Sequence, residues 1–161
     1  MKVKQVLLSM AFFMMTGMLF GQSTQWNFDK SHTKVQFTAT HMKISEVTGQ
    51  FKEYSGTILT DGDNFSDAKI KVNIKASSVD TDNDRRDGHL QGEDFFNTEK
   101  YPDITFVSES MGKVDDQEYK LKGELTIKDV TKTVELDVDY KGMVEAMVDP
   151  SAGFQITRTS D

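Results

Sequence analysis

The chain of 161 residues is long enough for one domain with a substantial hydrophobic core. Its 26 acidic and 19 basic residues give a formal net charge of -7, which argues against nucleic acid as a partner and against electrostatic docking on anionic lipid. Because the chain has no cysteine, neither a disulfide nor a lipid-modified cysteine can hold it, and the fold must depend on its core.

The first 21 residues have the features of a secretory signal peptide. Lys2 and Lys4 form a basic start, an apolar run covers residues 6–20, and Gly21 is a small residue suited to a cleavage site. The run is short and lies at the amino terminus, which favours a cleaved signal over an uncleaved membrane anchor, the alternative interpretation. We therefore expect a periplasmic or secreted protein in which residues 22–161 form a single domain.

Alternation of polar and apolar residues with period two runs through most of the mature chain. It predicts strands at 34–40, 47–51, 54–60 and 69–75, and then from 104 onward, at 119–127, 133–140, 143–148 and 154–157. The pattern is clearest at 69–75, where Ile70, Val72 and Ile74 share one face. About eight or nine short antiparallel strands predict an all-β fold, whose apolar faces are buried either around a closed barrel or against a second sheet.

One stretch, residues 81–102, breaks this alternation with the sequence TDNDRRDGHLQGEDFFNTEKYP. Its acids, arginines, glycines and aromatic residues predict a short helix and loop that crosses one end of the β-structure and plugs it with aromatic rings. Thr81 or Asp82 is expected to cap the helix, since short polar side chains accept hydrogen bonds from the free amides at a helix start. A calcium-binding loop is the less favoured alternative, because Arg85 stands where such a loop needs glycine and Gln91 where it needs glutamate.

Signatures of catalysis are weak. The chain has no cysteine nucleophile and no Gly-x-Ser-x-Gly motif, and His32, His41 and His89 do not have the spacing of a zinc site. If these histidines converged in space, the protein could be a metal-assisted hydrolase, which is one alternative function.

A charged triplet, Arg85, Arg86 and Asp87, lies in the predicted helix. It could clamp a phosphate or a quinone carbonyl, since arginine recognises such oxygens with two parallel hydrogen bonds. The alternative is a structural role in which salt bridges attach the crossing segment to the rim of the barrel.

Three blocks of sequence carry a resemblance to a known family. They are FDKSHTKVQFTATHMKISEVTGQF, TDNDRRDGHLQGEDFFNTEKYPDITF and GELTIKDVTKTVEL. From Trp26 to its end the chain resembles the YceI-like, polyisoprenoid-binding proteins of bacterial periplasms, with small departures at Gly92, Asn97 and Asp129. The family pattern continues beyond residues 158–161, so we expect a barrel that is incomplete on its carboxyl-terminal side, with a gap and an unpaired edge.

The resemblance implies a lipocalin-like antiparallel β-barrel whose apolar pore binds a long-chain isoprenoid lipid, either a polyisoprenoid or an isoprenoid quinone. It implies no enzymatic activity, no metal and no further cofactor. The protein would carry or sequester the lipid and make transient contact with a membrane, and its open edge could give a homodimer. A ligand-free structural or stress-related β-domain with a filled core is the other alternative.

Alternation and family together predict the residues of this site. The inward residues expected to contact lipid are Val35, Phe37, Phe51, Ile70, Val72, Phe95, Phe96, Phe106, Leu125, Leu136 and Val138. The residues expected at the polar mouth, where the head group would lie, are Arg85, Arg86, Asp87 and His89.

Overall fold

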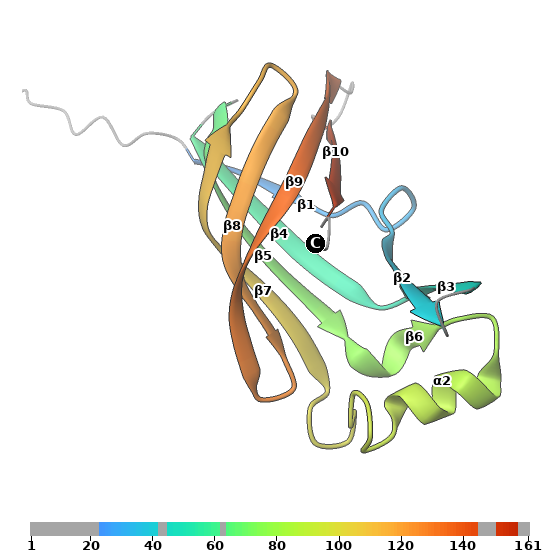
Figure 1. Cartoon of the computed structure of the whole chain (residues 1–161). Helices are drawn as coiled ribbons and strands as arrows, with labels where there is room; N and C mark the ends of the chain where they lie inside the picture. Colours follow the sequence, from blue (N-terminus) through green and yellow to red (C-terminus); the bar gives the residue numbers. More distant parts are fainter. Residues whose placement is uncertain (1–22, 42–44, 62–63, 145–150, 158–161) are drawn as a thin grey trace, which may run out of the picture.

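Two antiparallel β-sheets and one short α-helix make up the described part of the chain (Figure 1). The computed structural model describes residues 23–41, 45–61, 64–144 and 151–157. The predicted signal peptide lies outside these ranges, as do residues 145–148 of a predicted strand. Within these ranges there is no helix with the length and apolar character needed to cross a membrane.

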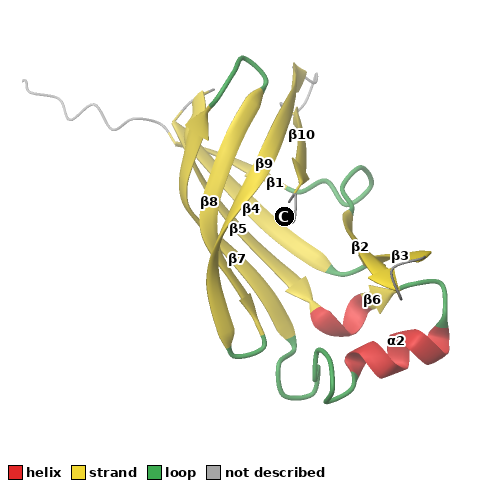
Figure 2. Ribbon diagram, in the orientation of Figure 1, coloured by secondary structure: helices red, strands yellow, loops and turns green. Residues whose placement is uncertain are grey.

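The larger sheet has seven strands and curves strongly, as Figure 2 shows. In spatial order its strands are β1 (Ser23–Asn27), β4 (Tyr54–Asp61), β5 (Asn64–Lys75), β7 (Asp103–Lys113), β8 (Glu118–Ile127), β9 (Val130–Val144) and β10 (Ser151–Thr157). The smaller sheet contains β2 (Val35–His41), β3 (Ser45–Phe51) and β6 (Val79–Asp80). Among the described residues no strand pairing closes the sheets into a barrel. The all-β fold with one helix confirms the prediction of an incomplete barrel.

The concave face of the larger sheet carries the main hydrophobic core. Strand pairing places Ile58 opposite Ile70 and Leu121 opposite Leu136, so apolar residues from successive strands lie side by side. Period-two alternation directs these side chains to one face and the lysines between them to the other. Leu121 is fully buried at the centre of this cluster, which also contains Trp26.

Gly123 allows an aromatic ring to lie close to the sheet. A Cβ at this position would lie 2.6 Å from the Phe106 ring and 2.5 Å from the carbonyl oxygen of Val107. The pairing of β7 with β8 shifts register between Ser108 and Ser110, next to the Ser108–Gly123 pair. A glycine at this bulge therefore lets the strand bend while the Phe106 ring covers the exposed backbone.

A second hydrophobic cluster lies where the smaller sheet meets the end of the larger one. It is built on Phe51, Ala76, Val79 and Ile104, and the half-buried Leu125 belongs to both clusters. The chain reaches this region from β5 through a 3-10 turn (Ala76–Ser78), β6 and helix α2 (Asp84–Gln91) before it returns along β7. The predicted crossing segment therefore exists and lies at one end of the curved sheet (Figure 1).

The cap of α2 differs from the prediction. Asn83, not Thr81 or Asp82, is the N-cap, and its side chain accepts a hydrogen bond from the Arg86 amide at 3.0 Å. Thr81 is buried and its hydroxyl is bonded to two other side chains, while Asp82 has a positive φ of 57°. The helix therefore starts one residue later than a cap at Asp82 would give, because the preceding backbone turns through the left-handed region.

Candidate functional site

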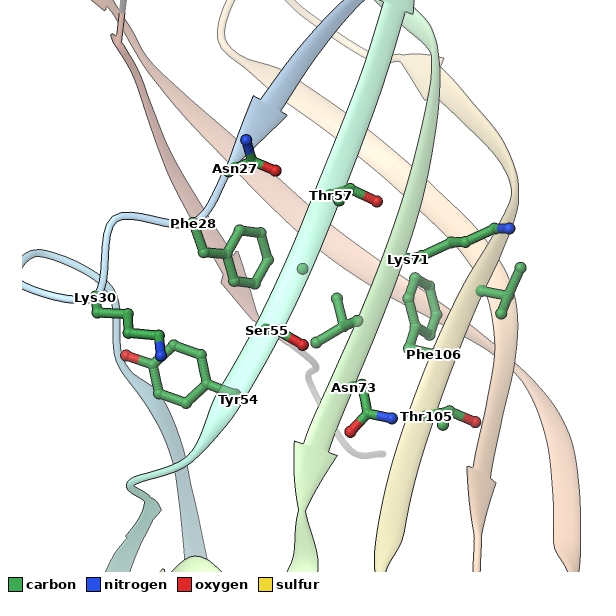
Figure 3. Close-up of a pocket in the computed structure, with 13 residues that line it drawn as sticks. Asn27, Phe28, Lys30, Tyr54, Ser55, Thr57, Lys71, Asn73, Thr105 and Phe106 are labelled. Carbon is green, nitrogen blue, oxygen red and sulfur yellow. The ribbon is translucent and has the colours of Figure 1, made fainter.

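The candidate site is an open cavity of about 460 Å³ over strands β4, β5 and β7 (Figure 3). Its volume lies within the range of roughly 300–1,000 Å³ found for small-molecule sites. The lining residues are Asn27, Phe28, Lys30, Tyr54, Ser55, Gly56, Thr57, Lys71, Val72, Asn73, Thr105, Phe106 and Val107.

The apolar wall of the cavity is one row of residues across four strands. Gly56 pairs with Val72, Val72 pairs with Phe106, and Phe106 pairs with Leu125. Directly paired residues share a face of the sheet, so this row continues the concave core. Phe28 packs above the row, since a Cβ at position 56 would lie only 2.5 Å from its ring. An apolar path therefore runs from Phe28 to Leu125, where the two hydrophobic clusters meet.

The loop that follows β1 forms the polar edge of the cavity. The Tyr54 hydroxyl donates a hydrogen bond to the carbonyl oxygen of Thr33, which attaches this loop to β4. Within the loop, the Asp29 carboxylate accepts hydrogen bonds from the Ser31 amide at 2.8 Å and from His32 Nδ1 at 2.6 Å. The hydrogen bond from His32, and then those from Ser31, hold the pKa of Asp29 far below its usual range. Asp29 therefore stays ionised, and both of its oxygens are engaged inside the loop.

The structure divides the predicted lipid-contacting residues between the two hydrophobic clusters. Val72 and Phe106 line the cavity itself. Ile70, Leu136 and Val138 lie in the main core beside it. Leu125 joins that core to the second cluster, which holds Val35, Phe37, Phe51 and Phe96.

Phe95 differs from the other predicted contacts. Its side chain is 47% exposed and meets the edge of the His89 ring, with the ring centroids 5.0 Å apart. The adjacent Phe96 turns inward and packs edge-on against Phe51 at 5.7 Å. The pair therefore splits, with one ring in the end cluster and one at the surface.

The residues predicted at the polar mouth lie away from the cavity. Arg86 donates from Nε to the Thr81 hydroxyl at 2.7 Å and from Nη2 to the Thr81 carbonyl at 2.6 Å. Asp87 accepts from the Thr81 amide at 2.9 Å and from its hydroxyl at 2.6 Å. These bonds attach α2 to the end of β6, which is the structural alternative considered for the triplet, although hydrogen bonds to Thr81 replace the salt bridges.

The remaining two mouth residues border a separate surface depression. Arg85 and His89, with Asn83 and Arg86, line a space of about 390 Å³ on the exposed side of α2. This depression shares no lining residue with the cavity over β4, β5 and β7.

No group of three or more potential metal-binding side chains occurs in the part of the chain that the structure describes. His32 lies beside Asp29 in the loop after β1, whereas His89 lies on α2 and contacts Phe95. The side chain of His41 falls outside the described part. The hydrolase alternative therefore gains no support from the described histidines.

Sequence reasoning missed Phe28, Lys30, Tyr54 and Gly56 as lining residues. One signal was present, because Trp26 and Phe28 are two residues apart and so continue the inward face of β1. Lys30 and Tyr54 line the same cavity because the loop after β1 is attached to β4, a tertiary contact that alternation does not encode.

The chain is similar to known proteins in sequence and in fold. The model of the YceI-like domain family matches residues 26–160. A UPF0312 protein of Staphylococcus aureus (strain USA300) is 35% identical over 134 residues, which are 83% of this chain and 74% of that relative. The crystal structure of a YceI protein of Campylobacter jejuni is 40% identical, with a TM-score of 0.66 over 80% of this chain and 76% of that one. BcnA of Burkholderia cenocepacia is 25% identical, with a TM-score of 0.66 over 71% of each chain.

Proposed function

The chain belongs to the family of YceI-like domains, and on this premise we propose that it binds a long-chain isoprenoid lipid and carries or sequesters it. The lipid is a polyisoprenoid or an isoprenoid quinone, and its tail lies along the apolar row from Phe28 to Leu125. The observation that carries the proposal is the open cavity of about 460 Å³ whose apolar wall is continuous with both hydrophobic clusters.

Burial of an isoprenoid tail can drive such binding without precise polar recognition. Each buried methylene contributes about 0.8 kcal/mol. Association is opposed by lost freedom estimated at about 4–15 kcal/mol. A few prenyl units are therefore enough to offset this cost, and a concave sheet face with a covering aromatic ring such as Phe28 suits a long chain without polar groups.

The chemistry of the cavity favours binding over catalysis. Its thirteen described lining residues include no histidine, cysteine, aspartate or glutamate, which are among the commonest general acids and bases. Lysine and tyrosine can also serve, but the Tyr54 hydroxyl is hydrogen-bonded to the carbonyl oxygen of Thr33. We therefore propose a carrier or storage protein and not an enzyme.

The proposed location is the periplasm or the exterior of the cell, after removal of residues 1–21. A lipid carrier there collects its ligand by transient contact with a membrane. The unclosed edges of the two sheets are the proposed surface for a homodimer, since an edge strand presents unpaired amide and carbonyl groups.

The test is mass spectrometry of organic extracts from the exported protein, purified from its native host without detergent. We expect one prenyl chain per protein at close to one equivalent, and the mass identifies the lipid. An empty extract together with no uptake of added quinone would reject the proposal in favour of the ligand-free domain.

A pair of variants ties uptake to the cavity. Val72→Asp places a carboxylate on the apolar row and is expected to abolish quinone uptake, whereas Lys69→Asp places one on the outer face of the same strand and is expected to retain it. Circular dichroism checks that both fold, and Val72→Thr, with a smaller loss of uptake, replaces Val72→Asp if that variant unfolds. Equal uptake by folded variants of both positions would remove the row from the binding site.

A further inference from the structure

One cationic side chain lies on the ligand side of the cavity. Lys30 and Lys71 are the charged residues among the thirteen that line it. Lys71 pairs with Thr57 and Val107 and precedes the inward Val72, so alternation directs its side chain to the outer face. Lys30 comes from the loop after β1 and lines the same cavity as Tyr54 (Figure 3). The cavity on the concave face of the sheet therefore has a positive charge, that of Lys30, at one edge.

Lys30 is not neutralised by the acid next to it in sequence. The Asp29 carboxylate accepts hydrogen bonds from Ser31 through one oxygen and from His32 through the other. No ion pair recorded among the described residues includes Lys30. The three N–H donors of its ammonium group can therefore bind an anionic group of a ligand.

The charge of this edge is opposite to that of the whole chain. The protein has 26 acidic and 19 basic residues, but no acid is among the residues that line the cavity. Charged groups at a ligand site set which head groups are accepted more than they set total affinity. A cation here thus favours ligands with an anionic oxygen group over neutral ones with the same tail.

The other candidates for a head-group site are committed elsewhere or distant. Arg86 and Asp87 are hydrogen-bonded to Thr81, and Arg85 and His89 border the separate depression on α2. The apolar row begins instead beneath Phe28, two residues from Lys30. A ligand whose tail follows this row has its head at the loop after β1, which leads into β2 (Figure 1).

From this arrangement we infer that Lys30 binds the carboxylate or phosphate of an anionic amphiphile whose tail lies along the Phe28–Leu125 row. Lys30 is thereby a specificity-determining residue, and among ligands with the same tail it favours a prenyl phosphate over a neutral prenol and a fatty acid over a fatty alcohol. The inference rests on the proposed function for the tail and adds the class of the head group.

The test compares ligands that share a tail and differ in the head. Dissociation constants are measured on the exported protein, by displacement of a neutral fluorescent probe, for geranylgeranyl phosphate against geranylgeraniol and for palmitate against hexadecanol. The proteins are wild type, Lys30→Gln, Lys30→Arg and, as a matched control, Lys69→Gln on the outer face of β5. Inorganic phosphate and acetate are tested alone as ligands without a tail.

We expect Lys30→Gln to weaken binding of both anionic ligands roughly three- to tenfold, as for a partly exposed ion pair. Binding of the two alcohols should not change, Lys30→Arg should restore the preference, and Lys69→Gln should behave as wild type. Because exposed charges are screened, 0.5 M salt should reduce the wild-type preference toward that of Lys30→Gln.

Three results would overturn the inference and leave the lipid-binding proposal intact. One is equal affinity of wild type for the anionic and neutral ligands. Another is an equal loss of both kinds of ligand in Lys30→Gln, which would mean that Lys30 only supports the loop. The third is displacement of the probe by inorganic phosphate or acetate as effectively as by the tailed ligands, which would mean a simple anion site. Failure of wild type to bind any tailed ligand would reject the proposed function and this inference together.

Discussion

The seven-stranded sheet and the crossing segment (residues 81–102) are stabilised in different ways. The sheet buries apolar side chains from β1, β4, β5, β7, β8 and β9, and Leu121 of β8 is fully inaccessible to solvent. Helix α2 has no buried residue, and hydrogen bonds of Arg86 and Asp87 to Thr81 attach it to the end of β6, while Leu90 and the following Phe96 pack against the second cluster. The sheet thus depends on many contacts that share the free energy of burial, whereas the crossing segment combines a small apolar contact with a few directional bonds. Substitutions should therefore act by volume in the first region and by donors and acceptors in the second.

The largest effect is expected in the core of the sheet. Leu121→Ala leaves a cavity between β7, β8 and β9, and we expect it to lower the free energy of unfolding by about 3 kcal/mol. Urea denaturation followed by circular dichroism measures this loss. Val114→Ala is the control, because Val114 is 60% exposed in the turn after β7 and its truncation should change stability by less than about 0.5 kcal/mol. Similar losses in the two variants would contradict the assignment of the core.

A second test of the sheet adds a methyl group at a position where the structure leaves no room for a Cβ. Gly123→Ala places a Cβ 2.5 Å from the Val107 carbonyl oxygen, and since backbone cannot move aside easily, we expect destabilisation of about 2 kcal/mol. The same change at Gly112, where a Cβ meets nothing within 4 Å, should be close to neutral. If thermal denaturation gave equal midpoints for the two variants, the close approach of Phe106 and Val107 to Gly123 would be wrong.

In the crossing segment the expected loss comes from a hydroxyl group. Thr81→Val keeps the volume of this buried side chain but removes the acceptor for Arg86 and the donor to Asp87, so we expect a loss of about 1–2 kcal/mol. Thr98→Val is matched to it, because the Thr98 hydroxyl makes one long hydrogen bond of 3.4 Å to the Gln91 carbonyl. Hydrogen exchange locates the effect, and faster exchange confined to α2 and β6 is expected. Uniform loss of protection across the large sheet would show that the two regions are not separate in this way.

Gly88→Ala in α2 is expected to raise the free energy of unfolding, whereas the same substitution at Gly123 in the sheet is expected to lower it. Gly88 is exposed within α2, and a Cβ there meets nothing within 4 Å. Alanine favours the helix over glycine by about 0.5–1 kcal/mol, so this variant should be stabilised by that amount or less. The same substitution at Gly123 is expected to destabilise. A loss of stability in Gly88→Ala, measured by the same urea titration, would mean that α2 packs against something not apparent from its exposed face.

The sequence predicts some strands of the two sheets better than others. Alternation located β2, β4, β7 and β8 well, because a strand with one buried face has apolar residues at every second position. It missed β1, a strand of five residues in which Trp26 is the one buried side chain, and it began β5 at 69 although the strand starts at Asn64.

Alternation predicts the inward-facing lining residues of β5 and β7 but not those that the loop after β1 brings to the cavity. Val72 and Phe106 follow from alternation, since a lining residue on a strand must face inward. Lys30 and Tyr54 line the same cavity because the loop after β1 lies against β4, to which the hydrogen bond from Tyr54 to Thr33 attaches it across 21 residues of sequence. Likewise, the triplet of Arg85, Arg86 and Asp87 was predicted at the polar mouth, with a structural role as the alternative, but a sequence pattern cannot say that Thr81 takes up the donors of Arg86.

The smallest expected effect concerns the ion pair between Lys52, which follows β3, and Asp80 of β6, the strand that leads into the crossing segment. Asp80 lies next to Thr81 and accepts from Lys52 Nζ at 2.8 Å, from the Asp82 amide at 3.2 Å and from Gln50 at 3.3 Å. The hydrogen bond from Lys52, followed by those from Asp82 and Gln50, lowers the pKa of Asp80, and the bond to Asp80 raises the pKa of Lys52.

The sign of the pH dependence follows from these two shifts. A carboxyl whose pKa is lower in the folded protein stabilises it above the unfolded pKa, near 3.8, and this contribution is lost as the pH falls through the folded pKa. The raised pKa of Lys52 gives a contribution that is present below the unfolded value of 10.5 and lost as the pH rises through the folded one. Asp80→Asn should therefore lower the melting temperature slightly at pH 7 and remove part of its fall below pH 4. Because Lys52 is exposed, 0.5 M salt should shrink the difference at pH 7. A variant with the full acid dependence of wild type would show that other carboxyl groups account for it.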